Sequence, residues 1–165
     1  MPIDLQSLTI ELSAPGEGRG PLRLLIVDDD VVQQELLKRT AARSGYQVSL
    51  AASCREAIRS IRSESFDCVI LDLELEDGDD VCKVMAETNY AGSIIIISGT
   101  EAARRSAARA FARSLGIAAQ GLPKPVDLAS LRVSLANLRK DLQGLPAIHA
   151  WGGAAVGRTK EEHRN

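Results

Sequence analysis

The sequence predicts an α/β protein whose five-stranded parallel sheet is doubly wound, with helices on both of its faces. Five short apolar segments alternate with five segments of helical periodicity, and this alternation requires a crossover between successive strands. The chain is 45% apolar but only 3% aromatic, so its core must consist mainly of leucine, isoleucine, valine and alanine. Because such crossovers are right-handed, only a few topologies of the sheet remain possible.

Short apolar runs bounded by turn residues predict the strands. The predicted strands are residues 23–28, 46–51, 66–72, 93–98 and 117–122. The runs that end at Val27 and Leu71 are continuously apolar, which is typical of strands buried on both faces of a sheet. Gly92 precedes the run from Ile94 to Ile97 and favours a turn at that point.

Capping residues and helical spacing predict the helices. The predicted helices are residues 31–44, 54–63, 79–87, 101–115 and 128–142. The apolar residues at helical spacing in the first of them are Val31, Val32, Leu36, Leu37 and Ala41. Gly45 and Gly116 each end a helix, and Asp127 caps the last one. Ser53 caps the second helix, where Glu56 completes a capping box.

Composition divides the chain into a central domain and two terminal segments. Residues 1–21 end in a cluster of glycine and proline, which predicts a flexible N-terminal segment. Residues 22–142 hold the whole alternating pattern and predict a single domain. Residues 143–165 are rich in glycine and carry mixed charges near their end, which predicts a mostly disordered tail.

Charge and composition exclude several functional classes. The net charge of −2 gives no global argument for binding to nucleic acid or to a membrane surface. No apolar run approaches the ~20 residues that span a bilayer, and the N-terminus lacks the pattern of a signal peptide. The three cysteines form no CxxC pair, which fits reduced thiols in the cytosol. We therefore expect a cytoplasmic protein without membrane attachment.

Chemically active residues follow four of the five predicted strands. Asp28 ends the first strand and Asp29 follows it, Asp72 ends the third, Ser98 ends the fourth, and Lys124 follows the fifth. Ligands of such sheets bind beyond the carboxyl ends of the strands, where these side chains are expected to meet. Carboxylates, a hydroxyl and an ammonium at one edge predict a site for Mg²⁺ and phosphoryl chemistry.

This pattern resembles the receiver domain of two-component response regulators over residues 22–142. The resemblance rests on the acidic pair, the aspartate after the third strand, the serine after the fourth and Lys124-Pro125 after the fifth. It implies a flavodoxin-like fold with strand order 2-1-3-4-5. It also implies a role in a phosphorelay, with a sensor histidine kinase or a histidine phosphotransfer protein as the phosphodonor. Such a domain is a phosphoacceptor that can dephosphorylate itself, rather than an enzyme.

Magnesium is the expected cofactor. Asp28 and Asp29 are the expected metal ligands, because Mg²⁺ prefers oxygen ligands. Its charge would neutralise the two anions that approach each other in the reaction, the accepting carboxylate and the phosphoryl group. The resemblance implies that Asp29 and Asp72 contact the metal directly and that Asp28 acts through water. It also implies that the backbone carbonyl of Glu74 is a further ligand.

The phosphoryl group is expected on Asp72, whose carboxylate would act as the nucleophile and form an acyl phosphate. Lys124 would supply a point charge for one phosphoryl oxygen, and Ser98 a hydroxyl donor for another. Gly99 leaves space for the phosphoryl group. Pro125 favours a turn that fixes the lysine, and the family often makes that peptide bond cis.

Three positions depart from the family pattern. Glu76 stands where a proline is usual in the loop after the third strand, and Asp80 stands where a glycine is usual. Both changes add negative charge near the metal site. Gly121 stands where an aromatic residue usually acts as a rotameric switch. The phosphorylation site is therefore complete in sequence, but the usual readout of phosphorylation is not.

The segment 101–115 is the expected partner surface. Four arginines against one acid predict either a solvated helix face or an interface for an acidic partner or a second copy of the chain. These arginines are Arg104, Arg105, Arg109 and Arg113. No DNA-binding module follows the predicted domain, so direct DNA binding is not expected. The chain fits a single-domain regulator or a fragment of a longer protein.

Two alternatives remain at the level of sequence. The run from Asp28 to Asp30 also matches the first motif of haloacid-dehalogenase-like phosphatases, with Asp28 as the nucleophile and Asp30 as the acid–base. That alternative lacks a later acidic motif and leaves Asp72 unexplained. Asp30 is expected simply to cap the helix that follows it. The second alternative is a degenerate receiver that acts only as a protein-interaction module.

Overall fold

Strands and helices alternate along the chain in the computed structural model, which describes residues 20–99 and 101–142. The strands are β1 (Leu22–Val27), β2 (Tyr46–Ala51), β3 (Cys68–Asp72), β4 (Ser93–Ser98) and β5 (Ala118–Pro123). The helices are α2 (Val31–Arg43), α3 (Cys54–Ser63), α4 (Gly78–Glu87), α5 (Ala102–Ser114) and α6 (Leu128–Leu142). Every predicted element is present, and every bound lies within two residues of its prediction.

The predicted terminal segments 1–21 and 143–165 fall outside the described residues, except for Gly20 and Pro21. Their flexibility and disorder stay predictions. The chain divides into two compact units, one of which is Pro21–Arg132. The described part of the other unit includes Val133–Leu142, the later part of α6. The whole sheet belongs to Pro21–Arg132.

Within the described residues, five strands form one parallel sheet in the order β2-β1-β3-β4-β5. This order confirms the predicted fold class and winding. The register aligns the carboxyl ends of the strands: Val27 lies opposite Leu71 and Ser98 opposite Pro123. The residues that follow β1, β3, β4 and β5 are therefore brought to one edge of the sheet.

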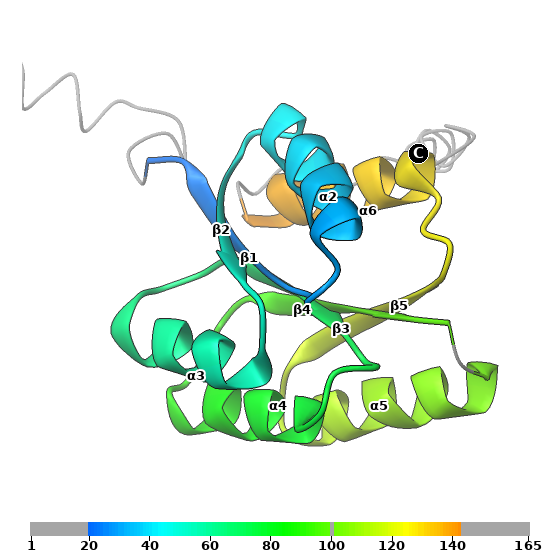
Figure 1. Ribbon diagram of the computed structural model, residues 1–165. Coiled ribbons are helices and arrows are strands. Elements are labelled where there is room, and N and C mark those ends of the chain that lie inside the picture. The colour runs from blue at the N-terminus through cyan, green and yellow to red at the C-terminus, as the bar shows by residue number, and fades with distance from the viewer. Residues whose placement is uncertain (1–19, 100, 143–165) are drawn as a thin grey trace, which may run out of the picture. The chain divides into compact units, whose positions relative to one another are not determined.

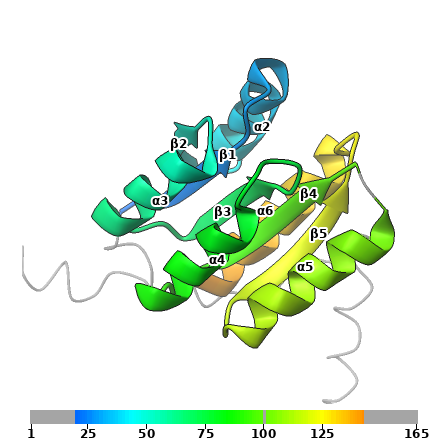
Figure 2. The ribbon, with the colours of Figure 1, turned by 60° about the horizontal axis from the view of Figure 1, so that its bottom comes forward.

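Helices cover both faces of the sheet. Helices α3, α4 and α5 lie side by side on one face, and α2 lies on the other (Figures 1 and 2). All residues of β3 and β4 are buried, which explains why both strands are almost continuously apolar. Alternate residues of β1, such as Leu25 and Val27, pack into a core with the α3–α5 face, and Leu24 and Ile26 point to the opposite face.

Side-chain caps start three of the helices. The Asp30 carboxylate accepts the backbone N–H groups of Val32 and Gln33 at 3.0 and 3.2 Å, so Asp30 caps α2 as expected. The Ser53 hydroxyl accepts the N–H of Glu56 at 3.1 Å. The Glu56 side chain accepts from the N–H of Ala52 at 2.9 Å, one residue before the cap. The box at α3 thus closes one residue earlier than the usual pattern. Finally, the carboxylate of Asp127 accepts from the N–H of Ala129 and the hydroxyl of Ser130 at the start of α6.

The buried stripe of α2 is narrower than the apolar pattern predicts. It consists of Leu37, Thr40 and Ala41, which lie three and four residues apart. Val31 and Val32 are 76% and 71% exposed, because they lie outside that stripe at the start of the helix. Their apolar character therefore does not contribute to the core.

None of the helices in the described ranges is both long and apolar enough to cross a membrane.

Candidate functional site

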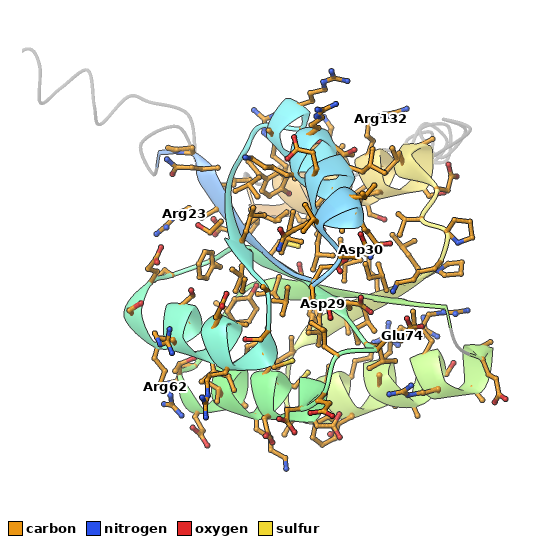
Figure 3. All side chains as sticks on the ribbon, in the orientation of Figure 1. Arg23, Asp29, Asp30, Arg62, Glu74 and Arg132 are labelled. Carbon is orange, nitrogen blue, oxygen red and sulfur yellow. The ribbon has the colours of Figure 1, made fainter. Side chains whose placement is uncertain are left out.

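The loops after β1, β3, β4 and β5 meet at the carboxyl edge of the sheet. Asp29 follows β1 and Glu74 follows β3, and both lie at this edge, whereas Asp30 lies at the start of α2 (Figure 3). The backbone N–H of Lys124 donates to the carbonyl of Ser98 at 3.0 Å, which ties the loop after β5 to the end of β4. The structure thus brings together all the residues that the sequence singled out for this edge.

Three carboxylates form a cluster at its centre. Asp28, Asp29 and Asp72 each offer an oxygen atom, and these atoms all lie within 4.8 Å of one another. Asp28 and Asp72 are buried, and Asp29 is exposed to solvent. The set consists of oxygen ligands with one side open, which fits a hard divalent cation such as Mg²⁺.

Asp28 is held by its own neighbours. Its carboxylate accepts the N–H of Asp30 at 2.8 Å and the side-chain amide of Gln33 on α2. Burial raises the pKa of the Asp28 carboxyl, and the bonds from Gln33 and Asp30 offset this only in part. A cation beside Asp28 would favour its charged form.

Asp72 is oriented by two contacts. One carboxylate oxygen accepts the N–H of Glu74 at 2.9 Å, and the other lies 3.0 Å from Nζ of Lys124. Asp72 is only 3% exposed, so this ion pair is largely shielded from water. Burial lowers the pKa of Lys124, but the hydrogen bonds to Glu74 and Asp72 outweigh it and leave that pKa raised. Lys124 is therefore a permanent cation beside the Asp72 carboxylate.

The side chain of Glu74 contributes a contact that the sequence did not predict. One of its carboxylate oxygens lies 3.0 Å from Nζ of Lys124, and the other accepts the backbone N–H of Gly99 at 2.8 Å. These contacts lower the pKa of Glu74, with the hydrogen bond from Lys124 as the largest cause. Sequence reasoning gave Glu74 only a backbone role, because spacing along a loop does not show where a side chain points.

Ser98 and Gly99 complete the edge next to Asp72. Ser98 is fully buried at the end of β4. A Cβ atom on Gly99 would lie 3.2 Å from the Glu74 carboxylate and 3.6 Å from the side chain of Lys124. Glycine at this position therefore leaves room beside the lysine. The Lys124–Pro125 peptide bond is cis, as the resemblance implied.

Of the two acidic departures from the family pattern, Glu76 lies in the loop between β3 and α4, and Asp80 lies in the first turn of α4. Asp77 in this loop has φ of 67°, in the left-handed region that few residues other than glycine adopt. Glu76 and Asp80 line a surface depression together with Lys83 of α4 and Arg104 of α5. The two added acidic residues thus border the same depression as two basic residues.

The arginines of α5 bind the protein's own backbone more than the sequence indicated. Arg104 donates to the carbonyl of Leu73 at 3.3 Å, and Arg105 donates to the carbonyl of Ser98 at 3.4 Å. A Cβ atom on Gly121 would lie 3.2 Å from Cδ of Arg109 and 3.4 Å from Cγ of Arg105. The aliphatic parts of these two arginines therefore cover the position where the family usually has an aromatic ring. Part of this helix face is therefore engaged within the protein, and its role as a partner surface stays a prediction.

Residues 24–136 match the family described as the response regulator receiver domain. The chain belongs to this receiver family. It is 36% identical over 121 residues to the response regulator MprA of Mycolicibacterium vanbaalenii, which covers 72% of this chain and 49% of that relative. It is 34% identical over 120 residues to MprA of Mycobacterium avium, covering 72% of this chain and 50% of that relative. The receiver therefore spans about half the length of the curated relatives it matches.

Solved receiver structures share this fold. The CheY-like response regulator receiver domain protein from Methanospirillum hungatei is 25% identical, with a TM-score of 0.65, and covers 76% of this chain and 98% of that one. A response regulator from Colwellia psychrerythraea is 27% identical, with a TM-score of 0.62, and covers 74% of this chain and 99% of that one. The phosphatase alternative loses its support, because the receiver family matches instead and the Asp30 carboxylate is engaged as a helix cap.

Proposed function

We propose that this receiver accepts a phosphoryl group on Asp72 in a Mg²⁺-dependent step of two-component signalling. The observation that carries the proposal is the position of the Asp72 carboxylate, which accepts a hydrogen bond from Lys124 and has an oxygen within 4.8 Å of oxygens of Asp28 and Asp29. The donor would be a phosphohistidine on a sensor kinase or on a phosphotransfer protein. The coarser role, that of a receiver domain in a response regulator, follows from the family itself.

The chemistry of the step is a transfer from nitrogen to oxygen. A carboxylate oxygen of Asp72 attacks phosphorus, a P–O bond forms, the P–N bond breaks, and the imidazole nitrogen of the donor keeps the electron pair. The N–H of Glu74 and the ammonium of Lys124 hold the carboxylate in one orientation before the attack. Lys124 then faces the charge that the phosphoryl oxygens bring to the site.

Asp28, Asp29, Asp72 and the backbone carbonyl of Glu74 would hold the cation. When bound, Mg²⁺ would neutralise these carboxylates and the approaching phosphoryl oxygens. The oxygen-only cluster with atoms within 4.8 Å supports this assignment. Ser98 would donate its hydroxyl to a phosphoryl oxygen from the neighbouring strand end.

The proposed setting is the cytoplasm, where sensor kinases present their phosphohistidine. The output would pass to a downstream protein or to a second copy of the chain, with α5 as the candidate contact surface. Direct binding to DNA is not part of the proposal.

Labelling by a small phosphodonor tests the proposal against the degenerate alternative. The chain is incubated with acetyl phosphate and Mg²⁺, and intact-mass spectrometry measures the gain of one phosphoryl group. We expect the wild type and Asp79→Asn to be labelled, because Asp79 lies in the first turn of α4 outside the cluster. Asp72→Asn should stay unlabelled. Equal labelling of Asp72→Asn would refute the assignment, and a wild type that takes no phosphate would favour a module that acts only through interaction.

A further inference from the structure

The Glu74 carboxylate accepts hydrogen bonds from two donors beside the proposed phosphoacceptor. Nζ of Lys124 lies 3.0 Å from Asp72 and also 3.0 Å from Glu74, so one ammonium joins the two carboxylates. The second oxygen of Glu74 accepts the N–H of Gly99 at 2.8 Å. Glu74 therefore bridges an ammonium on the loop after β5 and an amide on the loop after β4.

These two donors border the space that a phosphoryl group on Asp72 would enter. Lys124 already contacts an oxygen of Asp72. It would therefore also lie within reach of the oxygens of a phosphoryl group attached to Asp72. Gly99 follows Ser98, whose strand β4 is the direct neighbour of β3. The space that glycine leaves at position 99 is bordered by the Glu74 carboxylate at 3.2 Å and by Lys124 at 3.6 Å. Carboxylate and phosphoryl groups both present anionic oxygens to such donors, so the two groups compete for one place.

The Glu74 contact is one that an incoming phosphoryl group can displace. The side chain of Glu74 is 39% exposed and that of Lys124 is 22% exposed, so solvent screens their ion pair in part. Asp72, by contrast, is buried and fixed by the N–H of Glu74. Glu74 can therefore swing out into water while Asp72 stays in position.

We propose that the Glu74 side chain competes with the phosphoryl group for two donors, the ammonium of Lys124 and the N–H of Gly99. By occupying them, Glu74 stabilises the unphosphorylated state and slows phosphorylation of Asp72. This inference rests on the proposed function of Asp72 as the phosphoacceptor. It gives the Glu74 side chain a role separate from that of its backbone carbonyl. Phosphorylation then requires the exchange of one anion for another on Lys124 and Gly99.

The rate of labelling by acetyl phosphate at fixed Mg²⁺ measures the competition. Glu74→Gln removes the negative charge and keeps the shape of the side chain, and it should speed labelling of Asp72 about three- to tenfold. Glu76→Gln is the matched control, since it removes one charge from the same loop and Glu76 has no hydrogen bond or ion pair within residues 20–99 and 101–142. Its rate should stay within about twofold of the wild type.

A second measurement follows the unmodified protein. The amide of Gly99 should shift in its NMR spectrum and exchange faster with solvent in Glu74→Ala, because its acceptor has gone, whereas Glu76→Ala should leave it unchanged. Equal labelling rates in Glu74→Gln and Glu76→Gln, or a Gly99 amide that ignores Glu74→Ala, would overturn the inference and leave the proposed function standing. If neither the wild type nor any variant is labelled on Asp72, the proposed function itself falls, and the competition falls with it.

Discussion

At the scale of single residues, the site concentrates negative charge and offsets it with one lysine. Asp28, Asp29 and Asp72 lie together, and Lys124 contacts Asp72 and Glu74. Burial already opposes ionisation of Asp28, as its raised pKa shows. Like charges held close together destabilise the fold until a cation binds them. Stability and cation binding should therefore be linked in this protein.

Mg²⁺ should raise the melting temperature of the wild type in the absence of any phosphodonor. Binding to the folded state alone stabilises it by about 3 kcal/mol at a hundredfold excess over Kd. Asp29→Ala removes the exposed member of the cluster and should abolish the increase, whereas Asp79→Ala should retain it. Differential scanning fluorimetry across a Mg²⁺ titration measures both. A wild-type melting temperature that is insensitive to millimolar Mg²⁺ would contradict the metal assignment.

Lys124→Ala should make the protein less stable and more dependent on Mg²⁺. Without the ammonium, the buried Asp72 carboxylate loses its cationic partner, which costs roughly 1–3 kcal/mol. A bound cation restores part of that neutralisation, so Mg²⁺ should stabilise the variant more than the wild type. Urea unfolding with and without Mg²⁺ gives the two differences. Lys83→Ala, on α4, is the control, and an equal Mg²⁺ effect in Lys124→Ala and the wild type would argue against this role of the lysine.

At the scale of elements, β5 has Gly121 at the position where the family pattern usually has an aromatic switch residue. Gly121 has no side chain to rotate, and the aliphatic parts of Arg105 and Arg109 lie over it. Arg105 also donates to the carbonyl of Ser98, at the end of β4. Ser98 is thus connected directly to α5 by an arginine, in addition to its pairing with β5. A conformational change needs an element with two arrangements, and α5 is the candidate here.

Beryllofluoride, which mimics a bound phosphoryl group, should therefore change hydrogen exchange in α5 more than in β5. Ser98 follows the added group, and its carbonyl moves with it against Arg105. Arg105→Ala should reduce the change in α5, whereas Arg39→Ala, on α2, should not. Mass-spectrometric exchange of peptides from Ala102–Ser114 and Ala118–Pro123 measures the two elements. A change confined to β5, with α5 silent, would show that the readout lies elsewhere.

Two glycines of the sheet region should differ in how much stability an alanine costs at each position. The three atoms nearest to a Cβ at Gly121 belong to arginine side chains, which can move, so Gly121→Ala should change stability by less than about 1 kcal/mol. A Cβ atom at Gly92 would lie 2.3 Å from the backbone oxygen of Asp67, so Gly92→Ala should cost about 1–3 kcal/mol. Chemical denaturation compares the two. Equal losses would mean that the arginines over Gly121 are as rigid as backbone.

At the scale of the whole molecule, all three cysteines are buried and free. Burial raises the pKa of Cys68 to about 12 and those of Cys54 and Cys82 to about 11. Thiols with such pKa values react slowly, because the thiolate is the nucleophile. The core thus holds its sulfur atoms in an unreactive form.

Iodoacetamide at pH 8 should leave the native protein unmodified and should label all three thiols in urea. Stability should also fall as the pH rises from about 9 toward about 12. In that range the thiol of Cys68 ionises in the unfolded chain while the folded state keeps its proton. Labelling of the native protein by iodoacetamide as fast as labelling in urea would contradict the low reactivity of the buried thiols. Cys68→Ala should lessen the loss of stability at high pH.

The sequence predicts the fold well because its signals are periodic and local. Alternating runs, caps such as Asp30 and Ser53, and turn glycines define every element to within two residues. Site positions follow from the strand ends, since parallel strands place those ends at one edge. Side-chain directions do not follow, because they depend on neighbours distant in the chain. The hydrogen bond from Gly99 to Glu74 and the position of the Arg109 side chain over Gly121 are therefore features that the sequence does not predict.

The bond between Asp72 and Lys124 joins residues that are 52 positions apart in the chain. Glu74 and Gly99, which also meet there, are 25 positions apart. No short stretch of the chain can therefore build this site by itself, and the loops that separate its parts must be closed first. A partly folded chain, in which β4 has not yet paired with β3 or β5 has not yet paired with β4, would hold the nucleophile without its lysine. Only fully folded molecules would then accept a phosphoryl group. Reactivity toward a small phosphodonor would therefore report the fraction of chains that have finished folding.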